Sequence, residues 1–170
     1  MKRGAELQAR EVAVRAVLAT VPDPELPALS LVDLGIVRDV CIEADGGVHV
    51  VLTPTYSGCP ATEVIVQSVQ AALHAAGLGP ARLSHRLAPA WTTDWISEEG
   101  RQKMLAYGIT PPGPAAASDS AVLHFHPRPL ACPRCSSRDT ERLSAFGSTA
   151  CKALHRCLAC REPFEHFKPI

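Results

Sequence analysis

Four cysteines near the C-terminal end of the chain form two Cys-x-x-Cys pairs. The first pair is Cys132 and Cys135, and the second is Cys157 and Cys160. Two such pairs are the usual ligand set of a structural zinc ion, and four thiolates leave no coordination position open for water or substrate. The 21 residues between the pairs contain two strand-like runs joined at Phe146-Gly147-Ser148. The pattern therefore predicts a β zinc ribbon that holds one structural Zn(II).

Seven cysteines in a chain of 170 residues could instead form disulfides. Their odd number, and the lack of a long apolar segment after Met1, favour reduced thiols in a cytoplasmic protein. If the strand before Cys157 alternates with a period of two, Cys151 lies on the same face as Cys157. Cys151 is therefore an alternate candidate for a metal ligand.

The formal net charge of the chain is zero, but the charge is unevenly distributed. Residues 1–120 contain nine basic and thirteen acidic side chains, whereas residues 121–170 contain eight and four. Four thiolates and one Zn(II) bring the charge of the C-terminal part to about +2, which is weak evidence for nucleic-acid binding and compatible with docking on an acidic protein. No run reaches the roughly 20 apolar residues of a membrane helix. We therefore expect neither a membrane nor a nucleic acid as a partner.

A proline-rich stretch divides the chain into two domains. Residues 111–120 read Pro-Pro-Gly-Pro-Ala-Ala-Ala-Ser-Asp-Ser, and their prolines cannot sustain a helix or a central strand. We expect a first domain over residues 1–110, a Pro/Ala linker over 111–120 and the zinc ribbon over 121–170.

The first domain has the pattern of a mixed α+β fold. Apolar residues at helical spacing predict a helix that ends before Pro22, and Pro60 is expected to open a second helix. Runs rich in β-branched residues on either side of Asp45-Gly46-Gly47 predict an antiparallel hairpin. The predicted order is helix-β-β-helix-β-helix, with strands at 36–43, 48–53 and 82–87 and a last helix at 97–106.

Cys59 is a further cysteine whose surroundings point to chemistry. If Pro60 is the first helical residue, Cys59 is the N-cap, where free N–H groups and the helix dipole stabilise an anion. Such a position lowers a thiol pKa from about 8.5 to between roughly 3.5 and 7.5, and the thiolate attacks electrophiles and binds soft metals. A capping cysteine without function is the alternative. Cys41, between Val40 and Ile42, is predicted to be a buried apolar residue.

Three segments of the first domain resemble the signature of a known family. Asp23-Pro24-Glu25-Leu26, Asp33-Leu34-Gly35-Ile36-Val37, and Thr53-Pro54-Thr55 leading to Cys59-Pro60 look like the SufT-like iron-sulfur assembly domain, over residues 6–90. Later segments resemble one branch of that family, the D proteins of phenylacetate degradation, which are encoded with the subunits of the ring-1,2-phenylacetyl-CoA epoxidase. These segments are 91–96, 107–112, the two cysteine pairs, 146–152 and 162–164.

The resemblance implies a fold, a functional centre and a partner. The family fold is a small α/β sandwich with a three-stranded sheet. Its functional centre maps onto Cys59, which would bind iron or an iron-sulfur cluster transiently, with Asp23, Glu25, Thr53 and Thr55 around it. The implied function is that of an accessory protein and not of an enzyme. It would mature or insert the iron-sulfur cluster of the epoxidase reductase, and other epoxidase subunits are further candidate partners.

Other functions remain compatible with the residues. An enzyme that uses Cys59 as a nucleophile on a CoA thioester would need a base such as His49 or His85 beside it. A non-catalytic scaffold within the epoxidase assembly would need no such base. The phenylalanines of the ribbon could stack on nucleic-acid bases, but a domain this small needs them for its core. The sequence leaves open whether the chain forms a homodimer.

Overall fold

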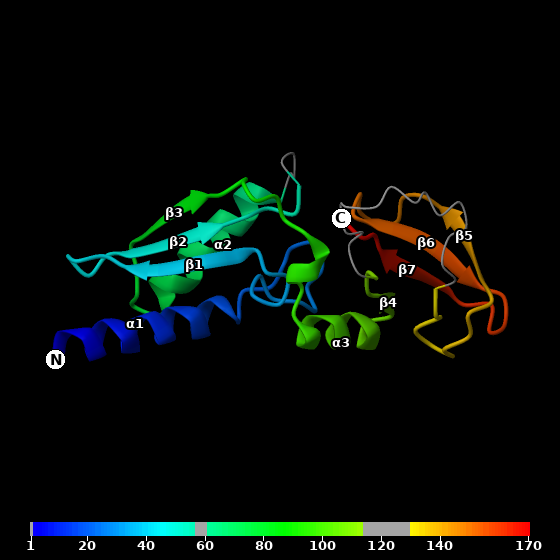
Figure 1. The fold of residues 1–170 in the computed structure, drawn as a ribbon, viewed down its shortest axis with the longest axis horizontal. Helices are drawn as coiled ribbons and strands as arrows, with labels where there is room; N and C mark the ends of the chain where they lie inside the picture. The colour runs from blue at the N-terminus through cyan, green and yellow to red at the C-terminus, as the bar shows by residue number, and fades with distance from the viewer. Residues whose placement is uncertain (1, 57–60, 114–129) are drawn as a thin grey trace. The chain divides into compact units, whose positions relative to one another are not determined.

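The computed structural model describes residues 2–56, 61–113 and 130–170 (Figure 1). The chain divides into two compact units. The N-terminal unit comprises residues 1–91 and 95–100, and the ribbon unit comprises residues 92–94 and 101–170. The ribbon unit thus includes residues that precede the expected linker at 111–120, most of which lies outside the described residues. Within the described part, no helix is both long and apolar enough to cross a membrane.

A three-stranded sheet lies in the N-terminal unit, in the order β1-β2-β3. β1 (Val37–Ile42) runs antiparallel to β2 (Val48–Leu52), and β2 runs parallel to β3 (Ala81–His85). A parallel pair needs a crossover connection, which contains α2 (Thr62–Ala75). Together with α1 (Lys2–Leu18), these elements confirm the predicted α+β fold and its three-stranded sheet (Figure 1).

Both helices pack on one face of this sheet. α1 contacts β1 and α2, and α2 contacts β3. Alternation with a period of two places Val48, Val50 and Leu52 of β2 on this covered face, where all three are buried. The helices contribute the buried residues Val14, Leu18, Ile65, Val69 and Leu73.

The opposite face of the sheet carries polar side chains. Cys41 follows Val40 in β1, and its register partner on β2 is His49. Since neighbouring residues of a strand point to opposite faces, the burial of Val40 turns Cys41 outward. Cys41 is exposed, so the prediction that it is buried is wrong. His49 Nε2 lies 2.8 Å from Ser84 Oγ on β3, which engages one of the two candidate bases in a hydrogen bond within the sheet.

The start of α2 differs from the prediction. Its first helical residue is Thr62 and its N-cap is Ala61, whose carbonyl accepts the N–H of Ile65 at 2.9 Å. Ala61 has no polar side-chain atom with which to cap the helix. The prediction that Cys59 is the N-cap is therefore wrong by two residues. Cys59 and Pro60 themselves lie outside the described residues.

The loop before β1 is held by hydrogen bonds to its backbone. The indole Nε1 of Trp91 donates to the carbonyl of Leu34 at 2.9 Å, and Asp33 Oδ2 accepts the N–H of Ser30 at 2.8 Å. Gly35 follows with a φ of +67°, in the left-handed region that favours glycine. A Cβ at this position would lie 2.6 Å from the carbonyl oxygen of Trp95, so the chain packs too closely here for any side chain.

The ribbon unit contains a second sheet, in the order β4-β7-β6-β5. β5 (Thr140–Ser144) and β6 (Lys152–Cys157) form the antiparallel hairpin expected between the cysteine pairs. β7 (Pro163–Phe167) pairs antiparallel with β6, and β4 (Ile109–Thr110) pairs parallel with β7. The ribbon therefore has two strands beyond the predicted hairpin.

Residues far apart in the sequence meet in the ribbon unit. The N–H of Thr93, in the short 3-10 helix η1 (Thr93–Trp95), donates to the carbonyl of Ile170 at 3.1 Å. The hydroxyl of Thr92 donates to the same oxygen at 2.9 Å. Arg101, in α3 (Glu98–Ala106), donates to the carbonyl of Thr93 at 2.9 Å. These bonds explain why residues 92–94 group with the ribbon unit.

Candidate metal centre

The thiols of Cys132, Cys135, Cys157 and Cys160 converge, and their Sγ atoms all lie within 4.8 Å of one another. The Cys132 and Cys160 sulfurs are 3.7 Å apart, and those of Cys135 and Cys157 are 3.5 Å apart. A tetrahedron with Zn–S bonds of about 2.3 Å has edges of about 3.8 Å, whereas a disulfide bond measures about 2.05 Å. The four sulfurs therefore fit a zinc ion and form no disulfide.

The two knuckles share one backbone geometry. The N–H of Cys132 donates to the carbonyl of Ser137 at 2.9 Å, and the N–H of Cys157 donates to the carbonyl of Glu162 at 3.0 Å, five residues on in both cases. The residue after each pair, Ser136 or Arg161, has a left-handed φ of 62° or 65°. Neither residue is glycine, so the sequence contains no signal for this turn. The left-handed conformation costs roughly 1–2 kcal/mol at each of the two residues.

The pKa values of the second pair show how the thiols share charge. The N–H of Cys160 lies 3.5 Å from Cys157 Sγ and is the largest influence that lowers the pKa of Cys157 to about 7. The N–H of Glu162 favours ionisation of Cys160, but burial and hydrogen bonds to the three other thiols raise the pKa of Cys160 to about 12. Four thiolates therefore need a cation to balance them. When bound, Zn(II) would supply that charge and hold the knuckles together.

Aromatic side chains pack behind the cysteines. Phe164 is buried against Cys132 and Cys157, and the ring of His155 stacks on it with centroids 5.6 Å apart. The ring of His166 meets His155 edge-on at 5.7 Å. Within the described part of the chain, His166 Nε2 is buried without a hydrogen-bond partner. The sequence analysis did not single out these two histidines, although their spacing on β6 and β7 matches the inward face of each strand.

We expect His166 to make the ribbon unit less stable in weak acid. Burial, and then the neighbouring His155, lower the pKa of His166 from 6.5 to about 4. In the unfolded chain His166 binds a proton as the pH falls through about 6.5, whereas in the folded chain it stays neutral down to about pH 4. The stability associated with neutral His166 is therefore present above pH 6.5 and is lost as the pH falls towards 4. The loss between pH 7 and 5 amounts to about 2 kcal/mol.

Urea unfolding of the zinc-saturated protein at several pH values tests this expectation. His166→Leu should lose less stability between pH 7 and 5 than the unsubstituted chain does. Equal losses in the two proteins would show that His166 does not carry this pH dependence.

An ion pair between a buried lysine and a partly buried glutamate holds the turn between β5 and β6. Lys152 Nζ, in a side chain that is 4% exposed, lies 3.0 Å from Glu165 Oε2. The N–H of Ser148, in the predicted turn, donates to Glu165 Oε1 at 2.5 Å. Burial opposes ionisation of Glu165, but Ser148 and Lys152 together lower the pKa of its carboxyl group. The turn is thus tied to β7, a strand that the sequence analysis did not predict.

Cys151, the alternate ligand, lies outside the group of four sulfurs that meet within 4.8 Å. Its buried Sγ is 3.0 Å from Thr149 Oγ1, and its carbonyl accepts the N–H of Lys168 at 2.9 Å. Cys151 therefore begins the paired region of β6 and β7, away from the knuckles.

The second predicted centre lies in the N-terminal unit. Asp23 is buried, and its Oδ1 accepts the N–H of Glu25 at 2.9 Å and that of Leu26 at 2.8 Å. Thr53 is 1% exposed, and its hydroxyl has no hydrogen-bond partner among the described residues. Glu25 and Thr55 are half-buried. Since Cys59 lies outside the described residues, its grouping with these four side chains stays a prediction.

Two family models match separate parts of the chain. Residues 11–80 match the model described as iron-sulfur cluster assembly protein, and residues 116–168 match the model described as PaaD zinc beta ribbon domain. The first match contains α2, β1 and β2, and the second contains all four cysteines of the candidate metal centre.

Relatives and solved structures agree with this division. A protein of Escherichia coli (strain K12), provisionally named as the D component of 1,2-phenylacetyl-CoA epoxidase, is 48% identical over 155 residues, which are 91% of this chain and 90% of the relative. An Fe-S protein maturation auxiliary factor of Porphyromonas gingivalis is 37% identical over 94 residues, 55% of this chain and 88% of the relative. The crystal structure of a domain of unknown function, DUF59, from Bacillus anthracis matches with a TM-score of 0.55 and 26% identity, over 59% of this chain and 96% of that one.

Proposed function

Since this chain belongs to the family of 1,2-phenylacetyl-CoA epoxidase D proteins, we propose that it is an accessory factor of that epoxidase and not one of its catalytic subunits. Its task is to mature or insert the iron-sulfur cluster of the epoxidase reductase. The observation that carries this proposal is the combination, in one chain, of an iron-sulfur assembly domain with four cysteines arranged to close a zinc site.

The two units have different roles in this proposal. A zinc ion held by four thiolates has no open coordination position and no redox chemistry, so the ribbon unit recognises the client and does not react with it. Thiolates are the ligands that iron-sulfur clusters prefer, and Cys59 supplies one for transient binding of iron or of a cluster. Among the described residues the buried hydroxyl of Thr53 has no hydrogen-bond partner, and this supports a binding site here, because leaving such a group unsatisfied costs about 1–3 kcal/mol.

Co-expression with the reductase tests the proposal. Cys59→Ala should lower the iron and acid-labile sulfide of the reductase several-fold without changing the amount of reductase protein. Cys41→Ala is the matched control, because it removes an exposed thiol from the same unit, and it should leave the cluster content unchanged. Truncation after Tyr107 should also lower the cluster content, through loss of docking.

Reductase binding and the cluster content of the reductase together distinguish a carrier role of Cys59 from a purely structural role of the chain. Binding of the reductase by Cys59→Ala, together with low cluster content, is the expected combination. Full cluster content with Cys59→Ala would exclude the carrier role and would leave a structural role within the epoxidase assembly.

A further inference from the structure

The four cysteines of the metal centre differ in their access to solvent. Cys132 is 2% exposed, Cys157 is fully buried, and Cys160 is partly buried. Cys135, in contrast, is exposed, although it holds the same place in the first knuckle that Cys160 holds in the second. A reagent dissolved in water therefore meets the metal centre first at Cys135.

Packing explains the difference between the two knuckles. The buried cluster behind the metal site contains Cys157 and Phe164, and Cys160 packs against this cluster. Cys135 is not among the described residues that form the cluster or pack on it. Residues 134–136 are all exposed, so the second half of the first knuckle lies in solvent.

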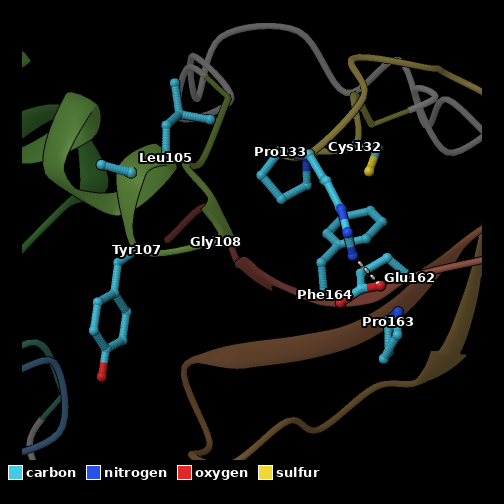
Figure 2. Close-up of a pocket in the computed structure, with 10 residues that line it drawn as sticks. Leu105, Tyr107, Gly108, Cys132, Pro133, Glu162, Pro163 and Phe164 are labelled. Carbon is cyan, nitrogen blue, oxygen red and sulfur yellow. Dashed lines mark hydrogen bonds and ion pairs between the residues drawn. The ribbon is translucent and has the colours of Figure 1, made fainter. Parts of the chain in front are cut away.

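A second route to the sulfurs would run through a cavity of about 430 Å³ beside the knuckles (Figure 2). Cys132 lines this cavity but is itself buried. Phe164 also lines the cavity, and Arg134 Nη1 donates to Glu162 Oε2 at 2.5 Å there, as the dashed line in Figure 2 shows. The cavity gives little access to a sulfur, and Cys135 is therefore the open side of the metal centre.

Exposure matters here because zinc holds its ligands in the thiolate form. A ligand thiol must lose its proton to bind the metal, and the thiolate is the form that attacks electrophiles. Cys41 is the other exposed cysteine among the described residues, but it lies on the N-terminal sheet and outside the metal centre. Susceptibility to oxidation follows thiolate character together with exposure. Of the described cysteines, only Cys135 combines the two.

A second thiolate lies within reach of Cys135. The Sγ atoms of Cys135 and Cys157 are 3.5 Å apart, so a disulfide of about 2.05 Å requires an approach of only about 1.5 Å. Cys157 is fully buried and is shielded from a reagent in solvent, so it reacts only with a sulfur inside the centre. Redox-sensitive cysteines often lie next to such a resolving cysteine.

We propose that Cys135 is a redox modification site, at which a hydroperoxide converts the metal centre into a disulfide between Cys135 and Cys157. The Cys135 thiolate attacks one oxygen of the hydroperoxide. The O–O bond breaks, an S–O bond forms, and the other oxygen leaves as hydroxide or, from an organic hydroperoxide, as alkoxide. The Cys157 thiolate then attacks the Cys135 sulfur, and the S–O bond breaks as hydroxide leaves. The two thiolates lose two electrons, the hydroperoxide gains them, and a dithiol reductant reverses the change.

The disulfide removes two of the four ligands from the metal site. Cys132 and Cys160 remain, which is half of the usual set for a structural zinc ion. Zinc is then released, and the knuckles lose the metal that holds them together. The loss of reductase binding that should follow rests on the function proposed above, whereas the chemistry at Cys135 does not.

Treatment of the zinc-saturated full chain with hydrogen peroxide tests the site. A chromogenic zinc chelator follows release of the metal, and mass spectrometry of peptides locates the disulfide after the remaining thiols are blocked. Zinc release and the disulfide between Cys135 and Cys157 should appear together and before oxidation of Cys41. Dithiothreitol with added zinc should restore the metal content.

Two histidine variants compare Cys135 with its counterpart Cys160. A structural zinc site accepts three thiolates and one imidazole, so Cys135→His and Cys160→His are each expected to keep the metal. Cys135→His lacks the exposed thiolate and should release zinc in peroxide several-fold more slowly than the unsubstituted chain. Cys160→His keeps both Cys135 and Cys157 and should release zinc about as fast as the unsubstituted chain.

Several results would overturn the proposal. These are retention of zinc after Cys41 has been oxidised, a first disulfide that lacks Cys135 or Cys157, and equally fast release of zinc from Cys135→His and the unsubstituted chain. Labelling of the unsubstituted chain with substoichiometric iodoacetamide needs no variant. Cys135 should be the first of the four ligands to be labelled, and labelling of Cys160 before Cys135 would contradict the proposal.

Reductase binding distinguishes failure of the site from failure of the proposed function. If the disulfide forms and zinc leaves while the reductase stays bound, the modification site stands and the recognition role of the ribbon unit fails. If reductase binding depends on the zinc-loaded ribbon but peroxide forms no disulfide at Cys135, the proposed function stands and the modification site fails.

Discussion

Replacing Cys157 by Ser is expected to release the zinc ion and to unfold the ribbon unit while the N-terminal unit stays folded. Cys157 is fully buried, and its sulfur accepts the N–H of Cys160. Zinc binding contributes about 10–16 kcal/mol to the folding of small Cys-rich domains, which is as large as the whole stability of a typical domain. The described buried cluster behind the metal site consists of Cys132, Cys157 and Phe164, so the knuckles pack on one large apolar side chain. Without the metal, too little apolar surface remains to hold the knuckles.

Metal analysis and NMR spectra measure the two parts of this prediction. The unsubstituted chain should contain one zinc, and Cys157→Ser should contain none and lose the dispersed signals of residues after 130. Cys41→Ser and Cys151→Ser are the controls, since neither sulfur belongs to the group of four, and both should keep the metal. Full zinc in Cys157→Ser together with loss of zinc in Cys151→Ser would reassign the ligand to Cys151.

Gly35→Ala should strongly destabilise the N-terminal unit. A Cβ there would lie 2.6 Å from the Trp95 carbonyl oxygen and 2.8 Å from Trp95 Cβ, closer than nonbonded atoms approach. The left-handed φ adds about 1–2 kcal/mol, and relieving the overlap adds about 1–3 kcal/mol. A total of about 2–5 kcal/mol is a large part of the 5–15 kcal/mol that stabilises most domains. Urea unfolding followed by tryptophan fluorescence is a direct readout, because Trp91 and Trp95 both lie in this unit and both contact this loop.

Gly46→Ala separates strain from overlap. Gly46 has a φ of +89°, but a Cβ there would meet no atom within 4 Å. Gly46→Ala should lower the free energy of unfolding only by the cost of the left-handed backbone, about 1–2 kcal/mol. Equal losses of stability in Gly35→Ala and Gly46→Ala would show that Trp95 does not pack tightly against Gly35.

Local patterns predicted most of the elements correctly. The runs rich in β-branched residues around Asp45-Gly46-Gly47 predicted β1 and β2, and helical spacing predicted α1 and α2, because each pattern lies within a single element. The two cysteine pairs predicted converging thiols for a similar reason, since a knuckle is built from six consecutive residues. The outward direction of Cys41 follows from its alternation with Val40, whereas the apolar character of its two neighbours, Val40 and Ile42, suggests burial.

The missed features depend on residues distant in sequence. β4 has only two residues, and β7 begins with Pro163, so neither is marked as a strand by its own sequence. β7 forms by pairing with β6, and β4 forms by pairing with β7. The N-cap of α2 carries no signal, because Ala61 lacks a polar side chain. The left-handed residues Ser136 and Arg161 are imposed by the knuckle hydrogen bonds rather than by their own preferences.

The bonds between Thr93 and Ile170 set the order in which the two units can be completed during synthesis. They join residues 77 positions apart, and β4 likewise waits for β7, which lies more than 50 residues later. The N-terminal unit, in contrast, contains no residue after Gly100 and can close while the ribosome is still translating the ribbon. During that interval the thiols of Cys132 and Cys135 emerge before their partners in the second knuckle. The nascent chain therefore presents the first half of the metal site before the second half exists, and a pair of thiolates can bind other soft metal ions as well as zinc.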